Sequence, residues 1–509
     1  MPKNAYYITT TLPYVNADPH IGFALEIVQA DIIARWHRLK GEEVVFNTGT
    51  DEHGQKIQDA AAKAGLDPQA YCDQYAAKFH ALKETLDLTY THFIRTTDAH
   101  HVAAAQEFWK RCDAADDIYK KQYQVKYCVG CELEKTDSEL VDGKCPIHPK
   151  LEIESRDEEN YFFRWSKYQD ALLKHYEANP GFVVPEHRLN EIRSFVSGGL
   201  QDFSISRLKE KMSWGVPVPG DEAHVMYVWF DALVNYISTI GWPNEKYAKF
   251  WPGTQVAGKD NLRQQSAMWQ GMLLSAGVPM SERIFIHGFI TADGQKMSKS
   301  LGNVVNPMDL VAMYGTDTVR YYLASLPAYE DGDYTAKQFE DIYTSKLVNG
   351  IGNLAARTAT MVEKYCEAKV PAKTEDRFET AAFWEKYGHA LENFHFDEAI
   401  RALEHYVTTV NQAIDVEAPF KKAKLGEDVA PFMYQLAEAQ RQIGLALLPI
   451  IPTAAAKILA QIGVEISSSN PHDRENLQLP EAQAWGGLEP GSPVKKGDIL
   501  FPRLEQKTA

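Results

Sequence analysis

The sequence predicts an α/β protein in which a parallel sheet is interrupted by an insertion and followed by a helical region. Three observations support this prediction. A strand, a helix and a second strand follow one another within the first 50 residues, a cysteine-rich segment breaks this rhythm between about residues 116 and 225, and strand-like patterns fade after about residue 335. A chain of 509 residues also exceeds the size at which one core usually stops growing, so several domains are expected.

The first strand–helix–strand unit places a ligand site. Residues 6–10 are aromatic and β-branched, as in a buried strand, and apolar residues then recur at helical spacing from Gly22 to a stop at Gly41. Val44 begins a second apolar strand. Such a unit forms a parallel sheet with a right-handed crossover, and ligands bind at the carboxyl ends of its strands. The loops at 12–20 and 49–54 should therefore lie beside the site.

The remaining elements follow in chain order. Helical patterns occupy about 56–85 and 99–115, the α/β rhythm returns at 225–231, and strands are expected at 255–258 and, as the last strand, at 284–287. The expected units are two halves of a sheet domain (1–115 and 226–335), an insertion (116–225), a helical domain (336–465) and a tail (466–509). In the tail, the apolar residues 499–501 should pack back on the body.

Bulk composition limits the function classes. The net charge of −16 argues against indiscriminate nucleic-acid binding but leaves room for a local basic face. No apolar run approaches the roughly 20 residues that a membrane helix needs, and no apolar leader begins the chain. The sequence predicts a cytoplasmic protein with no membrane contact.

Four residues in the insertion have the spacing of a zinc site. Cys128 and Cys131 form one C-x2-C pair, and after thirteen intervening residues Cys145 and His148 form a C-x2-H pair. Three thiolates and one imidazole suit tetrahedral Zn²⁺ and leave no open position, so one structural zinc per chain is expected. The alternative is two unrelated pairs.

Two short motifs point to a nucleotide phosphate. His20 and Gly22 open the first predicted helix, whose free N–H groups and partial positive charge favour an anion. Far along the chain, Lys296 and Lys299 lie in a cationic loop after the turn at residues 293–294. Alone, the histidine could be an ordinary loop residue and the lysines a solvated basic turn. Together, in this order and each after a predicted strand, they favour a site for a polyphosphate.

These two motifs, Pro-His-Ile-Gly at 19–22 and Lys-Met-Ser-Lys-Ser at 296–300, resemble the signatures of class I aminoacyl-tRNA synthetases. The resemblance implies a Rossmann-like catalytic domain, with Mg²⁺ on the phosphates of ATP. It implies catalytic roles for His20, Lys296 and Lys299. The ATP site would comprise His20, Gly22, Gly258, Asp260, Lys296, Met297, Ser298 and Lys299. One departure is Phe23, which stands where the family has its second motif histidine.

Within this class the chain resembles the methionyl-tRNA synthetases of the single zinc-knuckle type over nearly its whole length. The matching stretches are residues 12–16, 48–54, 227–232 and 285–288. The implied methionine pocket comprises Leu12, Tyr14, Asp51, Trp229, Ala232, Tyr236 and Gln265. Asp51 would hold the ammonium group, and aromatic rings suit a polarizable thioether. Ordinary core packing is the alternative for Trp229 and Tyr236, whose spacing allows a shared helix face.

A second departure falls in this pocket. Where the family commonly has a histidine, this chain has Gln265, so an amide would face the thioether.

A polar stripe in the helical region is a candidate RNA-binding face. Asn349, Asn353 and Arg357 recur four residues apart, and amides and guanidinium groups can read base edges or stack on bases. A solvated polar stripe is the alternative. The resemblance implies that these residues bind the anticodon together with Phe420, which replaces a family tryptophan.

The sequence therefore predicts a methionine–tRNA ligase that activates methionine with ATP, charges tRNA(Met) and supports translation initiation and elongation. The insertion of about 110 residues leaves no room for an editing domain, and cysteinyl-tRNA synthetases distribute their zinc ligands differently. The rivals are a nucleotidylyltransferase acting on a small acid and a catalytically inactive RNA-binding relative. With no further module expected after residue 509, a monomer is predicted.

Overall fold

The computed structural model describes residues 5–131, 133–135, 140–297, 302–466 and 479–504. At its centre is a parallel six-stranded sheet in the order β3-β2-β1-β12-β13-β7. Its strands are β1 (Ala5–Thr9), β2 (Glu43–Thr50), β3 (His92–Arg95), β7 (Val183–Val184), β12 (Thr254–Gly258) and β13 (Arg283–His287). The predicted α/β class with a parallel sheet is confirmed.

Several strands differ from the sequence expectations. β3 and β7 were not expected, because four and two residues are too short to show a pattern. The stretch at 225–231 does not join the main sheet. It is divided between β11 (Asp221–Met226), which pairs antiparallel with β9 (Ser206–Leu208) and β10 (Pro217–Val218), and a short helix. β13 is not the last strand, because β14 (Ile290–Ala292), β15 (Gln295–Lys296) and β16 (Gly332–Tyr334) form a further small sheet.

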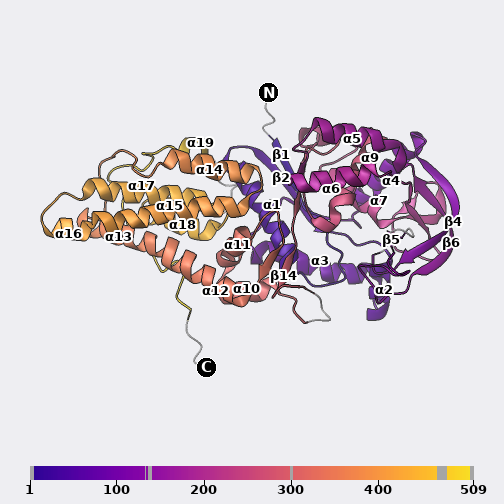
Figure 1. Cartoon of the computed structure of the whole chain (residues 1–509), viewed down its shortest axis with the longest axis horizontal. Coiled ribbons are helices and arrows are strands. Elements are labelled where there is room, and N and C mark those ends of the chain that lie inside the picture. Colours follow the sequence, from indigo (N-terminus) through magenta and orange to yellow (C-terminus); the bar gives the residue numbers. More distant parts are fainter. Residues whose placement is uncertain (1–4, 132, 136–139, 298–301, 467–478, 505–509) are drawn as a thin grey trace.

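Helices cover the sheet on both faces, and an antiparallel sheet carries the cysteine-rich segment (Figure 1). The antiparallel strands are β4 (Ile118–Cys128), β5 (Leu133–Glu134), β6 (Glu154–Phe163) and β8 (Phe203–Ser204). The helices of this half are α1 (Ile21–Leu39), α2 (Gln55–Ala64), α3 (Pro68–Thr85), α4 (Ala99–Ala114), α5 (Gln169–Ala178), α6 (Glu186–Ser197), α7 (Val228–Ala232), α8 (Asn235–Ser238), α9 (Trp269–Ser275), α10 (Pro307–Tyr314) and α11 (Thr316–Ser325). Short 3₁₀ turns span Trp165–Tyr168, Glu245–Lys249 and Lys259–Asn261, and a π-helical turn spans Gln264–Met268.

After β16 the described chain is helical, and this helical half of the molecule extends away from the sheet, with α16 at its far end (Figure 1). Its elements are α12 (Ala336–Ile342), a π-helix (Tyr343–Gly352), α13 (Asn353–Tyr365), α14 (Thr380–Glu392), α15 (Phe396–Glu417), α16 (Pro419–Lys424), α17 (Ala430–Leu447), α18 (Pro452–Ala460) and α19 (Leu479–Ala482). In the described residues, no helix combines the length and apolar character needed to cross a lipid bilayer.

A buried ion cluster joins the sheet half to the helical half. Asp31 on α1 binds Arg35 at 2.7 Å and Arg320 of α11 at 2.8 Å. Arg320 also donates to the carbonyl of Pro449, in the link between α17 and α18, at 3.1 Å. Burial alone would raise the pKa of Asp31, but the charges of Arg35 and Arg320 outweigh burial and hold that pKa well below its usual value. The carboxylate thus stays ionised between its two arginines.

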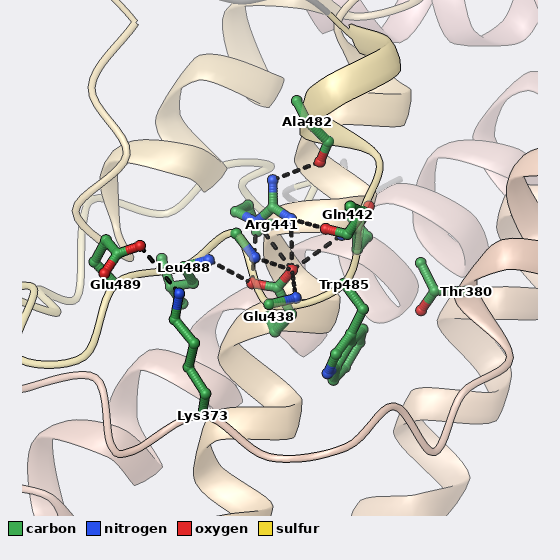
Figure 2. Close-up of polar contacts among 12 residues, drawn as sticks. Lys373, Thr380, Glu438, Arg441, Gln442, Ala482, Trp485, Leu488 and Glu489 are labelled. Carbon is green, nitrogen blue, oxygen red and sulfur yellow. Dashed lines mark hydrogen bonds and ion pairs between the residues drawn. The ribbon is translucent and has the colours of Figure 1, made fainter.

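The C-terminal segment folds back on the helical half through a second buried carboxylate (Figure 2). Glu438 of α17 pairs with Arg441 and accepts hydrogen bonds from the backbone N–H groups of Gly486 (3.1 Å), Gly487 (3.3 Å) and Leu488 (2.9 Å). A Cβ on Gly487 would lie 2.6 Å from the Arg441 guanidinium, so only glycine fits there. Farther along, the buried Phe501 packs on Tyr343.

Candidate active site

The loops after β1 and β2 lie side by side at the carboxyl edge of the sheet. The Asp51 N–H donates to the Pro13 carbonyl at 3.0 Å, and Tyr14 and Asp51 form an isolated parallel bridge. The side chains of Thr10 and Thr48 hydrogen-bond at 2.8 Å beneath them. This edge is where an open parallel sheet binds its ligands, and the two loops are those expected from the sequence.

His20 caps the N-terminus of α1, the helix that follows the first of these loops. Its Nδ1 accepts the N–H of Gly22 at 3.0 Å, in the N-cap position of α1. Because Nδ1 accepts, the ring proton is on Nε2 and can be donated to a ligand. A Cβ on Gly22 would lie 2.9 Å from the His20 ring, so this glycine makes room for the capping histidine. The ring of Phe23 packs edge-on against the ring of Phe79, which is an apolar contact.

A buried ion pair that the sequence did not reveal ties three elements together beside His20. Glu26 of α1 accepts from the backbone N–H of Thr11 at 2.7 Å and contacts His287 Nε2 at 3.0 Å. Nδ1 of His287 donates to the Gly288 carbonyl at 2.7 Å. Burial alone would lower the pKa of His287, but the hydrogen bond and charge of Glu26 outweigh it, so the pKa is raised. The only sequence signal was the matching stretch at 285–288.

Two of the expected ATP residues, Gly258 and Asp260, lie beside His287 of this pair. A Cβ on Gly258 would lie 2.9 Å from Asp260 Oδ1 and 3.6 Å from the His287 ring, so the backbone is close to both. Burial raises the pKa of Asp260. Lys296 is exposed at the end of β15, with Nζ 5.8 Å from the ring centre of Phe289, and Met297 packs on the core. Ser298 and Lys299 lie outside the described residues.

The expected pocket residues come from three separate segments. Leu12 and Tyr14 lie in the first loop, and the Tyr14 ring meets the Trp229 ring edge-on at 6.5 Å. Ala232 ends α7, and Tyr236 on α8 accepts a hydrogen bond from Gln265 at 2.7 Å. Trp229 and Tyr236, whose spacing allowed a shared helix face, lie on two separate short helices, because α7 ends at Ala232 and α8 begins at Asn235.

A buried carboxylate fixes the Asp51 loop against α7. Asp231 binds His53 Nδ1 at 2.9 Å and His101 Nε2 at 3.1 Å, and all three side chains are buried. Burial alone would raise the pKa of Asp231, but the two histidines outweigh it and lower that pKa. Since Asp231 is two residues from Trp229, this contact sets the position of one pocket wall relative to another.

The cysteine–histidine cluster has the geometry of a metal site. The ligand atoms of Cys128, Cys131, Cys145 and His148 all lie within 4.8 Å of one another. Cys131 Sγ is 3.3 Å from Cys145 Sγ and 3.2 Å from His148 Nδ1. These separations are close to those between ligands on one tetrahedral Zn²⁺, so the residues fit the expected ion. A Cβ on Gly130 would strike the His148 ring at 2.5 Å, so Gly130 is required for closure.

The polar stripe lies across the join between the π-helix and α13. Asn349 and Asn353 are exposed, whereas Arg357 is half-buried and its NH2 pairs with Asp415 at 2.9 Å. Phe420 is the second residue of α16, and its side chain is 43% exposed.

Comparison with known proteins identifies the family. The family described as tRNA synthetases class I (M) matches residues 6–152 and 149–359. A methionine–tRNA ligase of Thermosynechococcus vestitus is 43% identical over 98% of this chain and 97% of its own length. A methionine–tRNA ligase of Thermotoga maritima is 40% identical over 99% of this chain and 81% of its own length.

A solved structure agrees with these relatives. Mycobacterium tuberculosis methionyl-tRNA synthetase in complex with methionyl-adenylate superposes with a TM-score of 0.89 at 38% identity, covering 98% of this chain and 100% of that one. The chain belongs to the methionyl-tRNA synthetases, class I enzymes that join methionine to tRNA with ATP.

Proposed function

We propose that this cleft carries out the family reaction in two steps, forming methionyl-adenylate from methionine and ATP and then passing the methionyl group to the 3′ end of tRNA(Met). The main support is the convergence, at one edge of the sheet, of a helix N-terminus with a free imidazole donor and a loop carrying Asp51. The relative solved with methionyl-adenylate has the same fold. The product supports translation initiation and elongation.

In the first step the methionine carboxylate attacks the α-phosphate in line, so the protein has to position the reactants and stabilise charge. We assign His20 Nε2–H, Lys296 and Lys299 to the phosphate oxygens, where hydrogen bonds that strengthen in the transition state lower the barrier. Gly22 would let the nucleotide come close to the backbone, and Gly258 and Asp260 would lie beside the ribose. Met297 and Ser298 complete the proposed ATP site. Mg²⁺, when bound, would neutralise charge on the phosphates.

The methionine side of the cleft would hold the substrate at both ends. Asp51 is assigned to the ammonium group, at the place where the two loops meet. The side chain would lie among aromatic and small residues, which suit an unbranched thioether. These residues are Leu12, Tyr14, Trp229, Ala232, Tyr236 and Gln265.

The helical half would bind the tRNA anticodon through Asn349, Asn353, Arg357 and Phe420. The exposed Phe420 can stack on a base, and stacking contributes about 1–3 kcal/mol per base. Arg357 keeps free N–H groups while it pairs with Asp415. We assign a structural Zn²⁺ to the cysteine–histidine cluster, whose four protein ligands leave no open position. We further propose that the protein is a monomer and that it is cytoplasmic. Its six cysteines, all of them among the described residues, form no disulfide, as is usual in a reducing compartment.

The test is ATP–pyrophosphate exchange with each amino acid in turn. We expect exchange with methionine alone, and a loss of at least about 100-fold in kcat for His20→Ala, in keeping with removal of one transition-state donor. The matched control is His389→Ala, which removes an exposed histidine from α14. Exchange with another amino acid would overturn the substrate. No exchange with or without tRNA would identify a catalytically inactive RNA-binding relative.

A further inference from the structure

A chain of buried polar side chains leads from the start of β13 to the Tyr236 hydroxyl. It comprises Gln270 of α9, Ser281, Gln255 of β12 and Gln265 in the π-helical turn, none more than 4% exposed. Uncharged polar groups so deeply buried are costly unless each is hydrogen-bonded in a compatible direction. Their directions can therefore be worked out from the fixed end of the chain.

The fixed end is Gln270, whose amide is oriented by two backbone groups. Its Oε1 accepts the N–H of Ser281 at 3.0 Å, and its Nε2 donates to the carbonyl of Gln265 at 2.7 Å. A backbone N–H can only donate and a carbonyl can only accept, so this amide has one possible orientation. The second hydrogen on Nε2 is donated to Ser281 Oγ at 3.0 Å.

From there each hydrogen bond sets the direction of the next. Ser281 Oγ accepts from Gln270 and donates its own hydrogen to Gln255 Oε1 at 2.6 Å, because the opposite orientation of the Gln255 amide would take this acceptor away from the buried hydroxyl hydrogen. Gln255 then presents Nε2 to Gln265 Oε1 at 3.1 Å. With its oxygen engaged, Gln265 presents Nε2 to the Tyr236 hydroxyl at 2.7 Å. The hydroxyl oxygen accepts, which leaves the Tyr236 O–H hydrogen for a group on another side.

We propose that Ser281, Gln255 and Gln265 form a polarised relay that keeps the Tyr236 hydroxyl a donor toward the substrate side chain. This inference rests on the proposed place of Tyr236 in the methionine pocket. A donor hydroxyl favours a side chain that can accept, and a thioether sulfur is a weak acceptor whereas a methylene is none. An amide at Gln265 has no proton to gain or lose near neutral pH, so the direction set by the relay does not change with pH. These are positioning residues, acting through Tyr236.

The test compares kcat/KM for methionine and for norleucine, which has a methylene in place of sulfur, in pyrophosphate exchange. Ser281→Ala removes the third relay residue counted from Tyr236, after Gln265 and Gln255. We expect the methionine-to-norleucine ratio to fall about two- to fivefold, the range for losing one neutral hydrogen bond, with norleucine little changed. Ser281→Thr keeps the hydroxyl and should keep the ratio.

A second variant reverses the relay. A carboxylate in Gln255→Glu accepts from both Ser281 and Gln265, so the Gln265 amide must turn its oxygen to Tyr236 and draw the hydroxyl hydrogen away from the pocket. The ratio should fall further than in Ser281→Ala. Ser266→Ala is the matched control, because the Ser266 hydroxyl in the same π-helical turn is buried with no hydrogen-bond partner among the described residues.

The outcomes separate the two proposals. If the wild-type chain exchanges with methionine, and the methionine-to-norleucine ratio is unchanged in both Ser281→Ala and Gln255→Glu, the relay alone is overturned. Equal losses for methionine and norleucine in Ser281→Ala would indicate a merely structural role and also overturn it. A wild-type chain that exchanges with another amino acid and not with methionine overturns the proposed substrate, and the relay with it.

Discussion

The cysteine–histidine cluster and the Glu438 cluster each fasten a segment with little core of its own, but with different chemistry. The first gathers four ligand side chains from residues 128–148, and apolar neighbours such as Ile147 stay 62% exposed. The second lets one carboxylate gather backbone N–H groups about 50 residues away (Figure 2). A metal requires particular side chains at short spacing, whereas a carboxylate can bind the backbone of any residue. Only the first is therefore visible in a sequence.

The largest expected effect is loss of the metal from the cysteine–histidine cluster. Structural zinc contributes on the order of 10 kcal/mol to small folded units, far more than the sparse apolar contacts of this segment can replace. Chelation, or Cys131→Ser, should remove hydrogen-exchange protection from the Val141 and Lys144 amides, which pair in the native fold. The half-buried Cys366 supplies the control, Cys366→Ser. Pyrophosphate exchange should persist, and its loss with the segment still protected would contradict a structural role.

The next largest effect is expected at Glu438. Glu438→Ala leaves the Arg441 guanidinium buried without its carboxylate, which costs about 3–5 kcal/mol in comparable pairs. The amides of Gly486 and Leu488 should lose their hydrogen-exchange protection. Glu438→Gln keeps an acceptor oxygen and should fall between wild type and alanine. Full protection in Glu438→Ala would show that the tail is held by its apolar contacts alone.

A pH dependence is expected for the buried carboxylate of Asp31, which joins the two halves. Its pKa is depressed in the folded chain, so its stabilisation is present above the unfolded pKa of about 3.9 and is lost as pH falls through the folded pKa. The difference in unfolding free energy between wild type and Asp31→Asn should be constant, at up to about 3 kcal/mol, from pH 8 to 5. It should shrink only below about pH 4. A difference that changed between pH 7 and 5 would mean that Asp31 is not held ionised by its arginines.

The smallest effect is expected for the exposed ion pair beside the Glu438 cluster. Lys373 and Glu489 are 3.1 Å apart, and their side chains are 46% and 75% exposed. Lys373→Ala should change the unfolding free energy by less than about 1 kcal/mol, because water and salt screen such pairs. If Lys373→Ala lowered the unfolding free energy as much as Glu438→Ala, buried and exposed ion pairs would contribute equally to holding the C-terminal segment.

Sequence reasoning recovered the fold class because its evidence is periodic or local. The strand–helix–strand start and the helical region after about residue 335 both left patterns within 15 or so residues. It missed β3 and β7, which are too short to show a period. It also did not show that 225–231 divides between a small antiparallel sheet and a helix, because strand pairing is a long-range choice.

The same difference between local patterns and long-range contacts applies to the candidate active site. Motif residues such as His20 were visible because a helix start and a glycine mark them. The contact between Glu26 and His287 was not visible, because the two residues are 261 positions apart in the sequence.

By itself the sequence determined the parallel-sheet start, the cysteine–histidine cluster and the family, because each depends on residue types at short, fixed spacing. Tertiary structure alone decided which buried polar groups face one another. Asp31 between its arginines, Glu438 beneath the tail and the relay ending at Tyr236 depend on groups brought together from distant segments. The physical reason is that hydrogen bonds and ion pairs act within about 4 Å, a distance that sequence separation does not encode.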